Sequence, residues 1–157
     1  MALKENIPAP AGLIIHKWTP PATSRYKLNL SCKVDGDGSK IGIGVIIRDS
    51  LGLVAAVKCF QITGGGDMLQ VHAQAVLAAL EFAYCIGFFQ LEVEVGHKEL
   101  LGLIHMSSPC LAPTGVLIED ICSWIHFFHF ISFSFIRSDC NKASQALATE
   151  ALSSFSA

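Results

Sequence analysis

The stretch Ile41-Gly-Ile-Gly-Val-Ile-Ile-Arg48 decides the fold, because its composition predicts a strand with a neighbouring strand on each side of it in the sequence. Before it, Tyr26-Lys-Leu-Asn-Leu30 alternates apolar and polar residues, and Gly36-Asp-Gly-Ser-Lys40 has the composition of a turn. After it, Asp49-Ser-Leu-Gly52 predicts a second turn, and residues 53–62 predict a third strand. We therefore expect three antiparallel strands joined by short turns.

Helices and strands alternate in the rest of the chain. Asp67 is a suitable helix cap, and the strictly alternating Leu91-Glu-Val-Glu-Val95 predicts a strand. The full expectation is a helix from 67 to about 87, a strand at 91–95, helices at 99–106 and 116–129, a strand at 131–136 and a helix from 141 to about 153. This order predicts an α/β fold, a mixed five-stranded sheet with helices packed on it.

Composition limits the class of protein. The chain has 157 residues, of which 52% are hydrophobic and 15% charged, and this excludes a disordered or coiled-coil chain. The longest apolar stretch, residues 76–89, contains Glu81 and is shorter than the roughly 20 residues of a membrane-spanning helix. Four of the six prolines lie in residues 1–21. We expect an N-terminal arm at residues 1–20, one domain at 21–157, and no membrane association.

Charge and cysteine usage indicate the compartment. The six cysteines form no CxxC pair, and the N-terminus lacks the apolar segment of a signal peptide, so we expect a cytoplasmic or nuclear protein. The formal net charge is −2, yet eight of the 11 Lys and Arg residues lie in the first 58 residues. This uneven distribution leaves nucleic-acid binding open.

Several short stretches, taken in order, resemble the ribonuclease H-like domain found in plant non-LTR retroelements and their stand-alone relatives. The resemblance runs from about Lys17 to Leu152, and no single stretch carries it alone. The matching stretches are Trp18-Thr-Pro-Pro21, Tyr26-Lys-Leu-Asn29, residues 42–52, His72-Ala-Gln-Ala75, Leu91-Glu-Val-Glu94, Ile118-Glu-Asp-Ile121, Cys140-Asn-Lys-Ala143 and Ala146-Leu-Ala148.

The resemblance implies a chemistry and also shows what the chain lacks. The family hydrolyses the RNA strand of an RNA–DNA hybrid with two divalent metal ions, which carboxylates from four positions hold. In this sequence the four positions fall at Ser31, Gln74, Gly96 and Gln145, none of which is acidic. The expectation is therefore a ribonuclease H-like pseudoenzyme, derived from a retroelement, that has no metal site and no cofactor.

Two arrangements would restore an acidic site. Asp35 would replace Ser31 if the first strand were shifted, although the hairpin before Gly42 would then be unusually short. Glu94 lies on the same strand face as Gly96 and would build a makeshift site with His97 and Asp139. Either arrangement would leave a residual metal-dependent ribonuclease as the third and weakest hypothesis.

Two binding functions remain. The first is a protein-interaction module, with a protein partner or self-association, because Phe127, Phe128 and Phe130 cannot all face inward from one helix end. The second is a non-cleaving binder of RNA–DNA hybrids or other nucleic acids. Its candidate contacts are Lys27, Lys33, Lys40 and Lys142.

Overall fold

The computed structural model of the chain describes residues 17–106 and 114–154, and its elements follow the order expected from the sequence. A single turn of 3-10 helix, Ser138–Cys140, precedes the last helix. The strands are β1 (Tyr26–Val34), β2 (Lys40–Arg48), β3 (Val54–Thr63), β4 (Gln90–Val95) and β5 (Phe130–Phe135), and the helices are α1 (Met68–Cys85), α2 (Lys98–Met106), α3 (Gly115–Ile125) and α4 (Lys142–Ser154).

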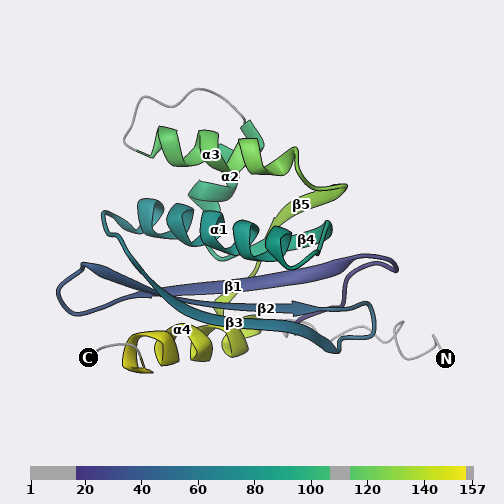
Figure 1. Cartoon of the computed structure of the whole chain (residues 1–157), viewed down its shortest axis with the longest axis horizontal. Coiled ribbons are helices and arrows are strands. Elements are labelled where there is room, and N and C mark those ends of the chain that lie inside the picture. The colour runs from purple at the N-terminus through teal and green to yellow at the C-terminus, as the bar shows by residue number, and fades with distance from the viewer. Residues whose placement is uncertain (1–16, 107–113, 155–157) are drawn as a thin grey trace, which may run out of the picture.

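The strands form one mixed sheet in the order β3-β2-β1-β4-β5. The first three pair antiparallel, whereas β4 pairs parallel with β1, and β5 parallel with β4. Helices α1, α2 and α3 lie on one face of this sheet and α4 lies on the other (Figure 1). The structure thus confirms the predicted α/β fold with a mixed five-stranded sheet.

Strand β2 shows why the sheet has two different faces. Ile41, Ile43, Val45 and Ile47 are fully buried in the core that includes α1. The alternate residues Gly42 and Gly44 face α4, and a Cβ at Gly44 would overlap the backbone oxygen of Ser144. The glycines therefore let α4 approach the sheet more closely than any side chain would permit.

The first described residues lie against the sheet. The Trp18 indole Nε1 donates to Asn29 Oδ1 at 2.7 Å, and the Ala22 amide donates to Glu92 Oε2 at 3.0 Å. The described part of the predicted arm is thus held by β1, and Ala22, which follows the arm, is held by β4. A domain boundary at residue 20 stays a prediction, and residues 1–16 lie outside the described residues.

Helix ends follow local chemistry. Asp67 caps α1 as expected: its side chain accepts from the Gln70 amide, and the Gln70 side chain accepts from the Asp67 amide. Helix α3 ends at Ile125 rather than near residue 129, because the chain turns at 126–129 before β5.

Within the described residues the five cysteines are free, and no helix is both long and apolar enough to cross a membrane.

Candidate functional site

A cavity opens where the parallel strands β1 and β4 separate. Their pairing ends at Asn29 opposite Glu94, although β1 continues to Val34. Ser31 and Gly96 each lie two residues beyond this last pair, on the two sides of the opening. The cavity measures about 280 Å³ and is lined by Leu30, Ser31, His72, Gly96, Phe135, Ile136, Ser138, Asn141 and Gln145.

Three of the four positions predicted from the resemblance meet in this cavity, namely Ser31, Gly96 and Gln145. Gln74 does not line it, because its Nε2 donates to the Gly65 and Gln70 carbonyl oxygens at 2.8 and 3.1 Å. Residues two apart on a helix point in nearly opposite directions, and His72 is the residue of α1 that lines the cavity. Gln74 therefore does not join the other three positions, and the correspondence of Gln74 to the family's position on this helix stays a prediction.

The His72 imidazole is electrically neutral near pH 7. Burial and, to a smaller extent, the nearby His97 together lower its pKa to about 4. The centroids of the two rings lie 4.9 Å apart. Because a depressed pKa keeps the proton off the ring, His72 adds no positive charge to the cavity at neutral pH.

Hydrogen bonds within the chain fix the wall that α4 and the preceding turn provide. Gln145 Nε2 donates to the backbone oxygen and to Oγ of Ser138, both at 2.9 Å. Asn141 Nδ2 donates to the Leu30 carbonyl at 2.9 Å, and Ser144 Oγ donates to Asn141 Oδ1 at 2.6 Å. The polar groups of this wall are thus partnered within the chain.

The residues of the cavity do not fit a pair of divalent magnesium ions. Ser31 and Gln145 offer neutral oxygens, His72 offers an imidazole and Gly96 offers no side chain. Hard dications bound a few ångströms apart require several negative charges from their ligands. Among the described residues, no three His, Cys, Asp or Glu side chains are placed to hold one metal ion.

The two arrangements that would restore an acidic site are not assembled. Asp35 belongs to the β1–β2 turn, where its Oδ1 accepts from the amides of Ser39 and Lys40 at 3.0 and 3.1 Å. Glu94 accepts from Asn29 Nδ2 at 2.7 Å and lies 3.3 Å from Lys27 Nζ. Neither carboxylate lines the cavity of Ser31 and His72.

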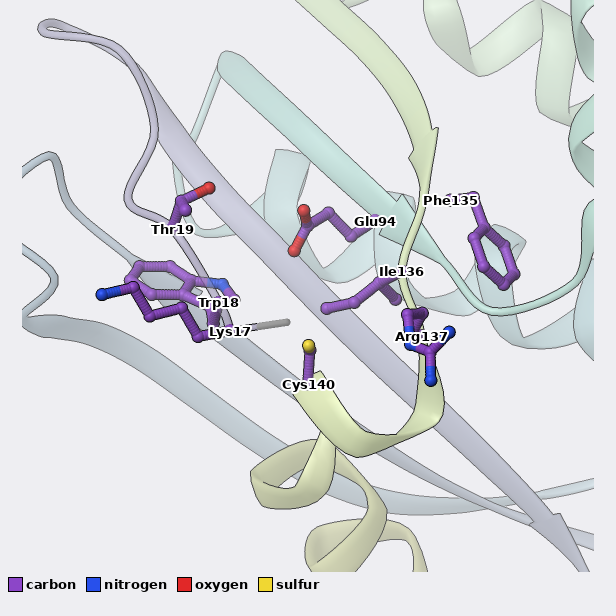
Figure 2. Close-up of a pocket in the computed structure, with 8 residues that line it drawn as sticks. All are labelled: Lys17, Trp18, Thr19, Glu94, Phe135, Ile136, Arg137 and Cys140. Carbon is purple, nitrogen blue, oxygen red and sulfur yellow. The ribbon is translucent and has the colours of Figure 1, made fainter. Parts of the chain in front are cut away.

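Glu94 instead lines a second hollow, of about 380 Å³. Figure 2 shows its carboxylate between Trp18 and Thr19 on one side and Ile136 on the other. Arg48 stacks over the Trp18 ring at 4.7 Å, and Lys27 Nζ donates to the Thr19 carbonyl at 2.8 Å. The hollow therefore lies over an ordered polar network that joins residues 18–19 to the sheet.

The predicted nucleic-acid contacts differ in accessibility. Lys27 is only 6% exposed and is held by Glu94 and Thr19, so it is not available to a phosphate, and this prediction is corrected. Lys33 and Lys142 are exposed, and Lys40 is half-buried. Lys142 lies with Lys98 and Arg137 around a third hollow, a grouping that the sequence did not indicate.

Apolar exposure is concentrated where the sequence did not predict it. Phe128 is buried, Phe130 is half-buried with Arg25 3.6 Å above its ring, and of the three only Phe127 is largely exposed. The larger group follows the β2–β3 turn and the start of β3, which is an edge strand of the sheet. We call it the β3 surface; it consists of Leu51, Leu53, Val54 and Val57, which are 81, 61, 57 and 50% exposed.

Comparisons with known proteins identify the fold and a family match. The model of the family described as "Reverse transcriptase-like" matches residues 31–151. No curated protein sequence matched this chain. Solved structures with the same fold include ribonuclease H1 from Halobacterium salinarum, with 20% identity and a TM-score of 0.74, covering 83% of this chain and 99% of that one.

Two further solved structures are similar to this chain in fold. The N-terminal ribonuclease H domain of a Mycobacterium tuberculosis protein is 16% identical, with a TM-score of 0.70 and coverage of 83% of this chain and 94% of that one. LC11 ribonuclease H1, a compost metagenome enzyme determined in complex with an RNA/DNA hybrid, is 19% identical, with a TM-score of 0.72 and coverage of 83 and 98%. At these identities the likeness shows the fold alone.

Proposed function

We propose, from the premise that the chain belongs to the reverse transcriptase-like family, that it is a ribonuclease H-like domain that does not cleave nucleic acid and acts by binding a protein partner. One observation carries the loss of cleavage: the cavity between β1 and β4 is lined by Ser31, His72, Gly96 and Gln145, with no carboxylate. Descent from a plant retroelement belongs to the same proposal and is supported by the sequence resemblance.

The physical reason lies in the charge that hydrolysis requires. Divalent ions stabilise the attacking and leaving oxygens of a phosphodiester, and carboxylates hold those ions in place. A cavity of neutral side chains provides no such ligands, and His72 remains uncharged at neutral pH. The arrangement supports a site that no longer performs two-metal hydrolysis.

The β3 surface supports the protein contact. Strand β3 has an open outer edge in the described sheet, and Lys58 is the only charged residue among its ten. Long apolar edge strands offer unpaired backbone groups to another chain, and natural proteins usually protect them with charges. Leu51 and Leu53 extend this apolar area onto the adjacent turn.

The proposal is tested by two measurements on the purified chain. Labelled RNA–DNA hybrid incubated with Mg²⁺ or Mn²⁺ should remain intact, whereas metal-dependent cleavage would establish a residual ribonuclease. Light scattering should show association that depends on concentration or on an added partner. The variant Val57→Lys should abolish the association, and Val116→Lys, the same change at an exposed residue of α3, should not. A strictly monomeric chain that binds no protein would refute the protein contact.

A second candidate function is nucleic-acid binding without cleavage. It is supported by the three cations Lys98, Arg137 and Lys142 around one hollow next to the cavity. A relative of the same fold, LC11 ribonuclease H1, has been determined with an RNA/DNA hybrid. Retention of nucleic acid that weakens with added salt would support this function.

A further inference from the structure

The three basic residues that follow residue 58 in the sequence lie around one hollow. Lys98, Arg137 and Lys142 belong to α2, to the segment after β5 and to α4 respectively. Together with Phe135, Ser138 and Asp139 they line a space of about 440 Å³. Residues 59–157 are otherwise acidic, so this hollow concentrates all the Lys and Arg charge of that part of the chain.

The charges in this hollow favour an anion. Asp139 is its one carboxylate, and Oδ1 of Asp139 lies 3.3 Å from Arg137 Nε. Lys98 and Lys142 are the first residues of α2 and α4, where the helix dipoles add positive potential. The adjoining cavity of Ser31 and His72 contains no carboxylate that would repel a phosphate.

Phe135 connects this hollow with its neighbours. It lines the hollow of the three cations, the cavity of Ser31 and His72, and the hollow over Glu94. Its ring is turned away from the Glu94 carboxylate, across the end of β5 (Figure 2). The residue is 39% exposed, and Lys98 Nζ lies 4.9 Å from the ring centroid. An exposed aromatic ring among cations is the arrangement that binds stacked bases and phosphates together.

We infer that this face binds an unpaired stretch of RNA or DNA, with backbone phosphates against Lys98, Arg137 and Lys142 and a base stacked on Phe135. In a duplex each base is covered by its neighbours, so only an unpaired base can lie on the ring. The inference rests on the second candidate function and specifies its ligand as single-stranded rather than hybrid. It is independent of the β3 surface, since the two surfaces share no residue.

Fluorescence anisotropy with labelled single-stranded RNA, single-stranded DNA and RNA–DNA hybrid tests the inference. Three phosphate contacts on a single strand predict that affinity falls about 20-fold between about 50 and about 200 mM salt. The triple variant Lys98→Gln/Arg137→Gln/Lys142→Gln should lose this salt dependence. The variant Phe135→Ala should weaken single-strand binding about tenfold and leave hybrid binding unchanged.

The matched control is Lys58→Gln, which removes an exposed charge on β3, outside the hollow, and should change affinity less than about twofold. Circular dichroism verifies that each variant is folded. Tighter binding of hybrid than of single strand would overturn the inference while leaving the second candidate function intact. Absence of binding to all three ligands would overturn both. Binding with cleavage of the strand would contradict only the proposed loss of catalysis.

Discussion

Acidification should destabilise the protein through His72. The pKa of this buried imidazole is lowered to about 4 from an ordinary value of 6.5. A histidine in the unfolded chain takes up its proton as the pH falls through 6.5, whereas folded His72 does so only near 4. The unfolded state therefore binds more protons between these values, and the free energy of unfolding falls as the pH decreases through this window.

The shift gives the size of the effect. A difference of this size corresponds to at most about 3–4 kcal/mol, because each pKa unit is worth about 1.4 kcal/mol. The measured loss should be smaller, since His72 is half-buried and solvent screens part of the interaction. The loss begins near pH 6.5 and is complete just below pH 4.

Urea denaturation of the wild type and of His72→Gln from pH 7 to pH 4 measures the effect. The free energy of unfolding of the variant should fall less than that of the wild type, because glutamine does not titrate. His72→Asn is a second variant that does not titrate, and a similar pH profile for both variants would show that the result does not depend on how glutamine packs. Parallel profiles of wild type and both variants would refute the placement of a neutral imidazole in this cavity.

Three substitutions should destabilise the fold in ways that urea denaturation can measure. Gly44→Val places a side chain against the backbone of α4 and should cost about 1–3 kcal/mol; an unchanged stability would contradict the close contact between β2 and α4. Asp67→Ala removes the cap of α1 and should cost about 1 kcal/mol, whereas Asp67→Asn should retain most of that stability. Glu94→Gln leaves Lys27, which is 6% exposed, without a charged partner and should cost about 3 kcal/mol; equal stability of Glu94→Gln and wild type would show that the pair contributes little.

The sequence predicted the fold because its local signals agree with the tertiary structure. The stretch Ile41–Arg48 was predicted as a strand and forms β2, and Asp67 marked the start of α1. The end of α3 was less visible, because the residues after Ile125 are as apolar as the helix itself. Only the turn at 126–129, which depends on the position of β5, ends the helix there.

The cavity was predicted in part, since Ser31, Gly96 and Gln145 follow recognisable stretches of sequence. Gln74 was expected with them because Ala73-Gln74-Ala75 resembles a family motif, but its side-chain amide donates to the carbonyl oxygens of Gly65 and Gln70 instead of lining the cavity. A signal for His72 was present, since it is the one ionisable residue between Asp67 and Glu81. Its direction toward the cavity depends on how α1 packs on the sheet.

The burial of Lys27 and the grouping of Lys98 with Arg137 depend on tertiary contacts that the spacing of residues in the sequence does not reveal. Lys27 alternates with apolar residues as a surface residue would, and residues 18–19, which show no periodicity, cover it. Lys98 and Arg137 lie 39 positions apart in the sequence. They meet because β4 and β5 are parallel neighbours, so the segments that follow both strands emerge at the same edge of the sheet.

Binding of Mn²⁺, followed by electron paramagnetic resonance of the free ion, tests the central claim most directly. The wild-type chain should leave the signal of free Mn²⁺ unchanged, because the cavity provides no carboxylate. A variant with four new carboxylates should reduce that signal, provided that circular dichroism shows it to be folded. Its substitutions are Ser31→Asp, His72→Glu, Gly96→Asp and Gln145→Asp. Binding of Mn²⁺ by the wild type that is lost in Ser31→Ala and His72→Ala would contradict the claim that this cavity no longer holds catalytic metal ions.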